Sequence, residues 1–309
     1  LRYNNLQENA FAPTLYDLIM TRPEMLGGTS DMAPDILYKN MNLVSMRTSW
    51  ANNTEGFFLA AKGGENGASH FHYDLGGFVM DVGGTRFAYE LGRESYATTA
   101  GDTETKQYKK RAEGHNTFVI NPDERPGQAN PATAQVVAFE TKPRGGYAVI
   151  DLAPAYSGAR NMKRGFFLTN DRQTMLIQDE ITLASSAELY WFMHTRGDIR
   201  FENEGKTAYI TFNSVTIRMD ILESDNAGAV FEERAALPLP TTPWLEGQGK
   251  NTNYKKLTVH WPEAQKFTLA IAVSQVLDET LEPYRPEVVP MEQWTIPDGE
   301  LSARPQLTA

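Results

Sequence analysis

The 309-residue sequence contains no cysteine. This absence excludes disulfide scaffolds, cysteine-ligated zinc, thiol nucleophiles and iron–sulfur clusters. Long apolar runs are also missing: no stretch approaches the ~20 residues that a helix needs to cross a bilayer, so we expect no membrane span. The first residues lack the apolar core of a signal peptide, and the sequence starts at Leu1 rather than at Met. We therefore expect a processed or trimmed piece of a longer polypeptide.

Positive charge is scarce, since 29 Lys and Arg stand against 39 Asp and Glu and give a formal net charge of -10. A protein that wraps nucleic acid neutralises phosphates with basic side chains, so we expect no nucleic-acid partner. Basic residues are concentrated only in the run 106–111. The sequence also lacks a nucleophile elbow, a Walker loop, an EF-hand and a dinucleotide-binding fingerprint.

From about residue 41 the chain consists of short runs rich in Val, Ile, Phe, Tyr and Thr, separated by Gly, Asn, Asp and Pro, which is typical of β-strands. Four pairs of runs indicate hairpins, with connections at residues 83–84, 144–146, 170–171 and 262–264. Polar and apolar residues alternate in several runs, which indicates strands with one wet and one packed face. The pattern predicts an all-β fold, a large two-sheet antiparallel β-sandwich.

The ends of the chain differ from this pattern. We predict a linker segment over residues 1–40, partly helical at residues 15–20 and then interrupted by Pro and Gly, followed by the sandwich domain over residues 41–309. The tail from Pro283 contains five prolines. We expect it to lie over the surface as an extended segment.

Three of the five histidines fall close together, at His70, His72 and His115. On an extended strand, residues 70, 72 and 74 would project from one face, so two imidazoles and the Asp74 carboxylate could converge. These are ligands that zinc uses where cysteine is missing, and Glu90 is a further candidate acid. The pattern fits a metal or acid–base site, and equally two half-buried polar residues on a strand.

The same region resembles the C-terminal β-sandwich of heparinase II/III-like polysaccharide lyases. The resemblance rests on the ordered combination of Ala61-Lys62-Gly63-Gly64-Glu65-Asn66, His70-Phe71-His72-Tyr73-Asp74, Gly76-Gly77-Phe78, Tyr89-Glu90-Leu91-Gly92 and Glu113-Gly114-His115-Asn116-Thr117, with Met46-Arg47-Thr48-Ser49-Trp50 before it. It covers about residues 41 to 125. Any one of these pieces alone would be a weak signal.

The resemblance implies roles for individual residues. It places zinc on His72, Glu90 and His115, with a structural rather than catalytic function, and leaves His70 facing the sugar as the catalytic histidine. Most relatives carry aspartate at the position of Glu90. Strand alternation would instead select Asp74 as the acidic ligand, and the two assignments compete.

The activity implied by the resemblance is cleavage beside a uronic acid by β-elimination. The reaction requires neutralisation of the uronate carboxylate, a base for the C5 proton and an acid for the leaving oxygen. Relatives complete this machinery with an N-terminal α/α toroid, which is missing from the 309 residues. We therefore expect an acidic polysaccharide substrate, the toroid as partner, a periplasmic or secreted location, and little activity from this chain alone.

Candidate substrate-binding residues are Arg47, Lys62, Tyr108 and Arg111. The last two belong to the basic run 106–111, which could present cations to sulfates or carboxylates. The alternative for this run is a solvated charged loop.

Two other functional classes remain open. One is a non-catalytic carbohydrate-binding or structural sandwich stiffened by zinc, and the other is a metal-dependent hydrolase. We expect His194, which lies in an aromatic run, to pack in the core.

Overall fold

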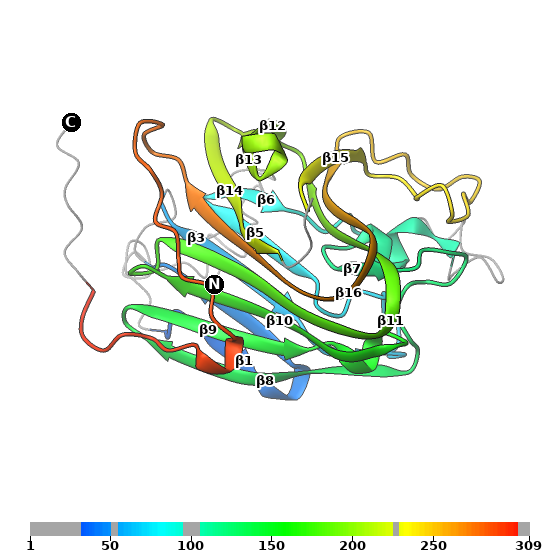
Figure 1. The fold of residues 1–309 in the computed structure, drawn as a ribbon, viewed down its shortest axis with the longest axis horizontal. Coiled ribbons are helices and arrows are strands. Elements are labelled where there is room, and N and C mark those ends of the chain that lie inside the picture. Colours follow the sequence, from blue (N-terminus) through cyan, green and yellow to red (C-terminus); the bar gives the residue numbers. More distant parts are fainter. Residues whose placement is uncertain (1–31, 51–54, 95–105, 225–228, 302–309) are drawn as a thin grey trace, which may run out of the picture.

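The computed structural model describes residues 32–50, 55–94, 106–224 and 229–301. Within these ranges the chain forms sixteen strands and six short 3-10 turns and contains no α-helix. The strands form two antiparallel sheets (Figure 1), which confirms the predicted two-sheet β-sandwich. The described part of the chain contains no helix of the length and apolarity that a membrane span requires.

The small sheet has five strands in the order β1-β2-β3-β5-β6. Their bounds are β1 Ile36–Tyr38, β2 Leu43–Arg47, β3 Phe57–Lys62, β5 Phe78–Val82 and β6 Thr85–Ala88. Buried and half-buried residues alternate along β2, β3 and β5, as expected for strands with one face on the core. The sheet already includes residues 36–38, which precede the predicted domain start at residue 41. The predicted helix over residues 15–20 lies outside the described residues.

The large sheet has eleven strands, nine of them in the order β12-β13-β14-β16-β11-β10-β9-β8-β4, with β15 paired to β16 and β7 to β11. Their bounds are β4 Gly64–Asn66, β7 Phe118–Ile120, β8 Ala132–Lys142, β9 Gly145–Asp151, β10 Ala159–Thr169, β11 Thr174–Thr195, β12 Asp198–Glu202, β13 Thr207–Phe212, β14 Val215–Ser224, β15 Phe231–Ala235 and β16 Lys255–Gln275. The two longest strands, β11 and β16, pair with each other along most of their length.

Three of the four predicted hairpins are confirmed, as β5–β6, β8–β9 and β10–β11. The fourth, around residues 262–264, is wrong, because β16 continues through these residues as one strand. In the pairing with β11 the register shifts here, so that Trp261 and Ala264 have partners and Pro262 has none. Since no neighbouring strand needs an N–H group from Pro262, the proline does not interrupt the strand.

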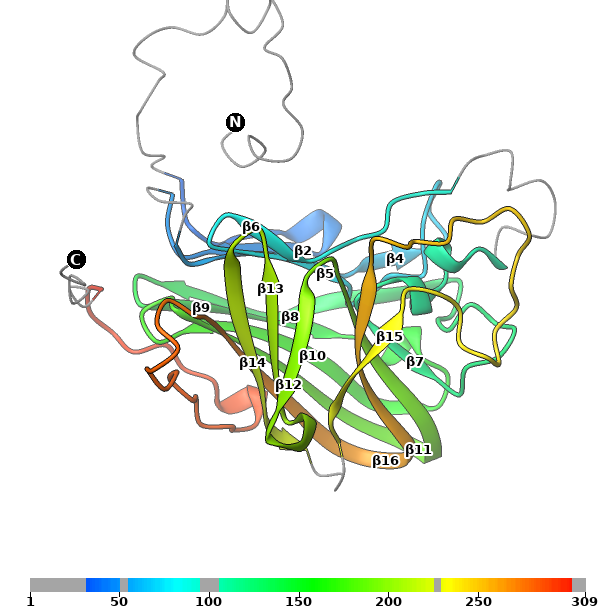
Figure 2. The same ribbon diagram turned by 90° about the horizontal axis from the view of Figure 1, so that it is seen from above.

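The main core fills the space between the two sheets, and Figure 2 shows the blue and cyan strands of the small sheet as a layer over the green strands of the large sheet. Phe78 of the small sheet contacts Phe166 and Trp191 of the large sheet, with ring centroids 5.4 and 6.4 Å apart. All three side chains are buried. Both sheets therefore contribute large side chains to one shared core.

The tail after β16 runs over the outer face of the large sheet as predicted, without strands among its described residues. It is held there by Met291, Trp294 and Ile296, which are buried against this face. Beside residues 288–292 lies a shallow groove of about 380 Å³ that none of the predicted site residues line.

Strand direction brings the candidate site together. β3 is antiparallel to β5 and β5 is antiparallel to β6, so the end of β3, the start of β5 and the end of β6 lie at the same edge of the small sheet. Lys62, the segment 70–77 and Glu90 therefore lie at one edge, although they are far apart in the sequence.

Candidate functional site

Residues 70–77 form a loop of turns rather than a strand. His70 is exposed and has a left-handed backbone conformation with φ of 59°. The prediction that residues 70, 72 and 74 share one strand face is therefore wrong, because the chain turns at this point. This removes the alternation argument for Asp74 as the partner of the histidines.

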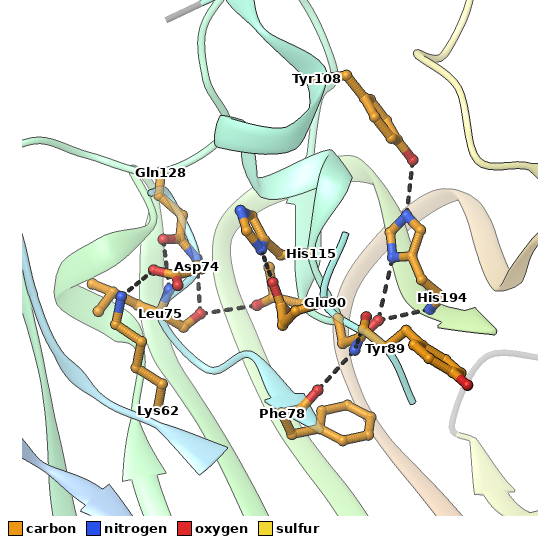
Figure 3. A network of polar contacts seen from close by, with 12 residues as sticks. Lys62, Asp74, Leu75, Phe78, Tyr89, Glu90, Tyr108, His115, Gln128 and His194 are labelled. Atoms are coloured by element: carbon orange, nitrogen blue, oxygen red, sulfur yellow. Dashed lines mark hydrogen bonds and ion pairs between the residues drawn. The ribbon is translucent and has the colours of Figure 1, made fainter. Parts of the chain in front are cut away.

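Glu90 and His115 form the closest contact of the site, with Glu90 Oε2 2.5 Å from His115 Nδ1 (Figure 3). His115 is buried, whereas Glu90 remains partly exposed. Burial alone would lower the pKa of His115, but the charge and the hydrogen bond of Glu90 outweigh it and raise the pKa. The contact with Glu90 therefore favours the protonated form of the His115 ring.

His72 lies beside this pair, with its ring centroid 5.1 Å from that of His115. Burial is the main cause that lowers the pKa of His72 to about 4, and the neighbouring His115, Lys110 and Lys62 act in the same direction. His72 is therefore neutral near pH 7, the state in which imidazole binds a metal.

Lys62 and Asp74 form an ion pair on the other side of the loop, with Nζ 2.5 Å from Oδ1 (Figure 3). This contact commits Asp74 to Lys62, whereas Glu90 contacts His115 directly. The observed geometry therefore favours Glu90 over Asp74 as the acid that accompanies the histidines.

Asn116 is a residue of the site to which the sequence analysis gave no role. Its buried side chain donates from Nδ2 to the carbonyl oxygens of Phe78 and Tyr89, at 2.7 and 2.9 Å. Its Oδ1 accepts the main-chain N–H of His194 at 2.6 Å. Tyr89 directly precedes Glu90, and Asn116 directly follows His115. The side-chain amide of Asn116 therefore holds the main chain next to both Glu90 and His115. The sequence feature that could have indicated a role for Asn116 is its position directly after His115, a candidate metal ligand.

Tyr108 and His194 lie next to this amide, and both are buried. His194 Nδ1 faces Asn116 Oδ1 at 3.2 Å, so Nδ1 carries the proton and Nε2 accepts the Tyr108 hydroxyl at 2.8 Å. Burial keeps the pKa of His194 well below its ordinary value, and the Lys256 charge adds to this effect. The predicted core role of His194 is confirmed. The Tyr108 hydroxyl is used inside the protein and is closed to a substrate.

Arg111 is also buried, contrary to the expectation of a cation that faces a substrate. Its guanidinium donates to the carbonyl oxygens of Asp123, Glu124 and Arg125 at 2.7, 2.9 and 2.5 Å. Through these contacts Arg111 stabilises the loop at residues 123–125. We include neither Arg111 nor Tyr108 in the proposed site.

Arg47 lies at the opposite end of the small sheet. It pairs with Phe58, whereas Leu43 pairs with Lys62, and four residues of strand correspond to about 13 Å. Its guanidinium lies 3.4 Å from the Trp50 ring centroid. The structure therefore does not bring Arg47 to the other candidate residues.

The donor set of His72, Glu90 and His115 fits zinc in its chemistry. His115 Nε2 and Glu90 Oε1 are buried and have no hydrogen-bond partner among the described residues, as expected of atoms that await a ligand. Nevertheless, no three such side chains in the described ranges are already arranged to hold a metal ion. The three groups are neighbours, but their side chains would have to move to form a coordination shell.

Comparisons with known proteins agree with this architecture. The model of the family "Heparinase II/III-like, C-terminal" matches residues 34–274. Among solved structures, a heparinase III described as the BT4657 gene product is 15% identical with a TM-score of 0.65, and the match covers 83% of this chain and 38% of that one. The heparan sulfate lyase HepC from Pedobacter heparinus is 16% identical with a TM-score of 0.62, covering 82% and 38%. A search of curated proteins found no match.

The chain therefore spans less than two fifths of the length of these two solved relatives. At this level of identity the structural matches show the fold alone, whereas the family match extends over most of the chain. This protein belongs to the heparinase II/III-like family and corresponds to its C-terminal region.

Proposed function

We propose that this chain is the C-terminal sandwich of a polysaccharide lyase that cleaves a uronate-containing polysaccharide by β-elimination. The observation that carries the proposal is the meeting of His72, Glu90 and His115 beside the exposed His70, at one edge of the small sheet. Two solved relatives are named heparinase III and heparan sulfate lyase, which supports an acidic glycan as the substrate class.

His70 is the proposed catalytic residue. A left-handed backbone costs a residue other than glycine ~1–2 kcal/mol, and such strain is concentrated at functional sites. Exposure lets the ring reach a bound sugar, and an imidazole can take up or deliver a proton near neutral pH. We assign to His70 the proton transfer at C5 or at the leaving oxygen of the glycosidic bond, with no water molecule consumed.

Zinc is the proposed cofactor of His72, Glu90 and His115. When bound it would supply a crosslink between three segments that meet at this edge, and thereby fix the loop that carries His70. The partnerless buried atoms of Glu90 and His115 support this assignment.

A second, N-terminal helical domain is the proposed partner within the complete enzyme. Elimination needs a group that neutralises the uronate carboxylate, a base that removes the C5 proton and an acid that protonates the leaving oxygen. His70 alone cannot perform all three tasks. The short span of this chain relative to its relatives supports a further domain. We also propose that the complete enzyme works in the periplasm or outside the cell, where polymeric glycans occur.

The function is tested with the complete enzyme, by following the ultraviolet absorbance of unsaturated uronate on heparan sulfate, hyaluronan and alginate. His70→Ala should abolish product formation, while His260→Ala, a histidine paired with Glu188 away from the site, should leave it unchanged. Full activity of His70→Ala would support a non-catalytic carbohydrate-binding sandwich instead. Saturated products that are lost on chelation would indicate a metal-dependent hydrolase.

The zinc assignment is tested separately on the chain itself, by metal analysis and thermal unfolding. The purified protein should contain one zinc per chain, and a chelator should lower its melting temperature. His72→Ala should contain less zinc and lose the response to chelator, whereas His260→Ala should keep both. A metal-free wild type that binds no added zinc would refute the assignment.

A further inference from the structure

The segment between β15 and β16 forms a closed loop over residues 236–251, drawn in yellow and gold in Figures 1 and 2. Its two ends meet, because Asn251 Nδ2 donates to the carbonyl oxygen of Ala236 at 3.0 Å. Inside the loop, Thr242 donates through its main-chain N–H and its hydroxyl group to the carbonyl oxygen of Leu239, at 3.0 and 2.8 Å. The segment is therefore an Ω-loop, a compact surface loop with neighbouring ends, and such loops are frequently functional.

Buried charged groups fasten the first half of this loop. Glu113 accepts the main-chain N–H of Leu239, and the Lys256 amino group donates to the carbonyl oxygen of Leu237 at 2.8 Å. Both Glu113 and Lys256 are almost fully buried. Burying a charge is costly unless the group is paired and hydrogen-bonded, and here both charged groups bond to the main chain of the loop. Glu113 itself lies two residues before His115.

Both halves of the loop adjoin the candidate site. Leu239 is buried in the same hydrophobic cluster as Tyr73, which directly follows His72. In the second half of the loop, Gln248 Oε1 accepts the main-chain N–H of Tyr108 at 3.0 Å. Figures 1 and 2 agree with these contacts, since both show the loop beside the teal segment that precedes β7. The loop therefore forms one border of the site.

Trp244 lies between these two anchor points and exposes a large aromatic surface. It is 46% exposed, whereas Trp191, Trp261 and Trp294 are almost fully buried. Trp244 is five residues from Leu239, so even a fully extended chain would place it at most ~18 Å from that residue. A glycan of a few sugar units that occupies the site extends over such a distance.

We propose that Trp244 is a stacking residue for a sugar unit of the substrate that lies beside the unit where the bond is cleaved. The inference rests on the proposed function, because it adds a subsite for the same substrate. One face of a pyranose ring carries C–H groups and is apolar, and an indole ring offers this face a flat, rigid partner. Because the loop is fastened on both sides, the indole is positioned before the glycan binds, which favours affinity. Stacking requires no positive charge, which suits a chain with a net charge of -10.

The test measures binding of a sulfated, uronate-containing hexasaccharide, and of the corresponding disaccharide, to the complete enzyme in a His70→Ala background that prevents turnover. Trp244→Ala should weaken hexasaccharide binding about tenfold. It should leave disaccharide binding within about twofold, because a disaccharide occupies the centre of the site without reaching the loop. Trp244→Phe should retain most of the affinity. The loss in Trp244→Ala should be the same at low and high salt, because stacking does not depend on charge.

Indole fluorescence provides a readout that a purely structural role of Trp244 would not change. Hexasaccharide binding should shift the emission of the His70→Ala protein to shorter wavelength, and Trp244→Phe should remove this shift while binding persists. The matched control Tyr284→Ala removes an aromatic residue of similar exposure, 48%, from the tail. It should change neither the affinity nor the emission shift.

Unchanged hexasaccharide affinity in Trp244→Ala, or equal losses for the two saccharides, would overturn the proposal, as would a His70→Ala protein that binds no hexasaccharide. Binding is measured without catalysis, so the proposed function and the stacking residue can fail separately. An enzyme that forms no unsaturated product but binds the hexasaccharide through Trp244 would refute the lyase and retain the stacking residue. An enzyme that forms the product but binds equally well without Trp244 would retain the lyase and refute the stacking residue.

Discussion

Arg172 and Asp35 form a buried, two-pronged ion pair that joins the two sheets. Nη1 and Nη2 of Arg172 donate to the Asp35 carboxylate at 2.9 and 2.8 Å, and both side chains are almost fully shielded from solvent. Arg172 lies in the turn between β10 and β11, whereas Asp35 directly precedes β1. The same guanidinium also donates to the carbonyl oxygens of Arg47, Lys142, Pro143 and Gly145.

Removal of the arginine should destabilise the sandwich strongly. In Arg172→Met the buried Asp35 carboxylate and several carbonyl oxygens lose their donors, so we expect a loss of about 3–5 kcal/mol in the free energy of unfolding. Denaturant titration measures this loss. Arg144→Ala breaks the more exposed pair with Asp171 near the same turn and should cost about 1 kcal/mol or less. Equal losses in the two variants would contradict the assigned role of Arg172.

The tail should be anchored by Trp294. Its ring fills the space above Gly165, where a Cβ atom would collide with it, and it also contacts Phe167 with ring centroids 5.2 Å apart. Trp294→Ala leaves a cavity on the outer face of the large sheet and should cost about 3 kcal/mol in unfolding free energy. Tyr284→Ala, at an exposed position of the same tail, should change stability by less than about 0.5 kcal/mol. An unchanged free energy of unfolding in Trp294→Ala would mean that the tail is not part of the folded unit.

The fold could be predicted because local signals and packing agree along most of the chain. Glycines and asparagines mark the β5–β6, β8–β9 and β10–β11 turns, and buried and half-buried residues alternate along β2, β3 and β5. The hairpin predicted at residues 262–264 was wrong because proline normally ends a strand. Its tolerance here depends on a register shift against β11, which is a property of the pair of strands and not of the local sequence.

The site could be predicted only as a set of residue types. Glu90 follows β6 of the small sheet, whereas His115 precedes β7 of the large sheet, so their contact joins segments of both sheets and is contained in no local pattern. The basic run illustrates the limit: its composition indicated cations for a substrate, but Arg111 and Tyr108 turn inward. One residue of shift along a 3-10 turn decides which side chain is accessible, and the sequence alone does not determine that phase.

Asn116 should control the geometry of the Glu90–His115 pair. Asn116→Ala removes the hydrogen bonds to Phe78 and Tyr89 and should release the chain beside Glu90. In the zinc-free protein, the ring proton on His115 Nδ1 reports this directly in nitrogen-resolved NMR, because the 2.5 Å contact with Glu90 moves its signal far downfield. We expect the signal to disappear in Asn116→Ala.

The matched control for this prediction is Asn66→Ala, which removes another buried asparagine with hydrogen bonds to Gln128 and Ala129. Both variants should lose about 1–3 kcal/mol of stability, but only Asn116→Ala should lose the His115 signal. Retention of the signal in Asn116→Ala would show that the amide supports the fold and does not position the pair.

Lys256 should make stability rise with pH. Its amino group is buried 3.7 Å from Glu113 and 4.5 Å from the Phe192 ring centroid, and burial lowers its pKa to about 8 from 10.5. Between these values the unfolded chain binds more protons than the folded one, so the unfolding free energy increases with pH. From pH 7 to 9.5 the wild type should gain about 2 kcal/mol relative to Lys256→Met. Lys255→Met, which removes a partly exposed neighbour, should cost about 1 kcal/mol or less. A constant difference between wild type and Lys256→Met across this range would show that the buried amine does not lose its proton there.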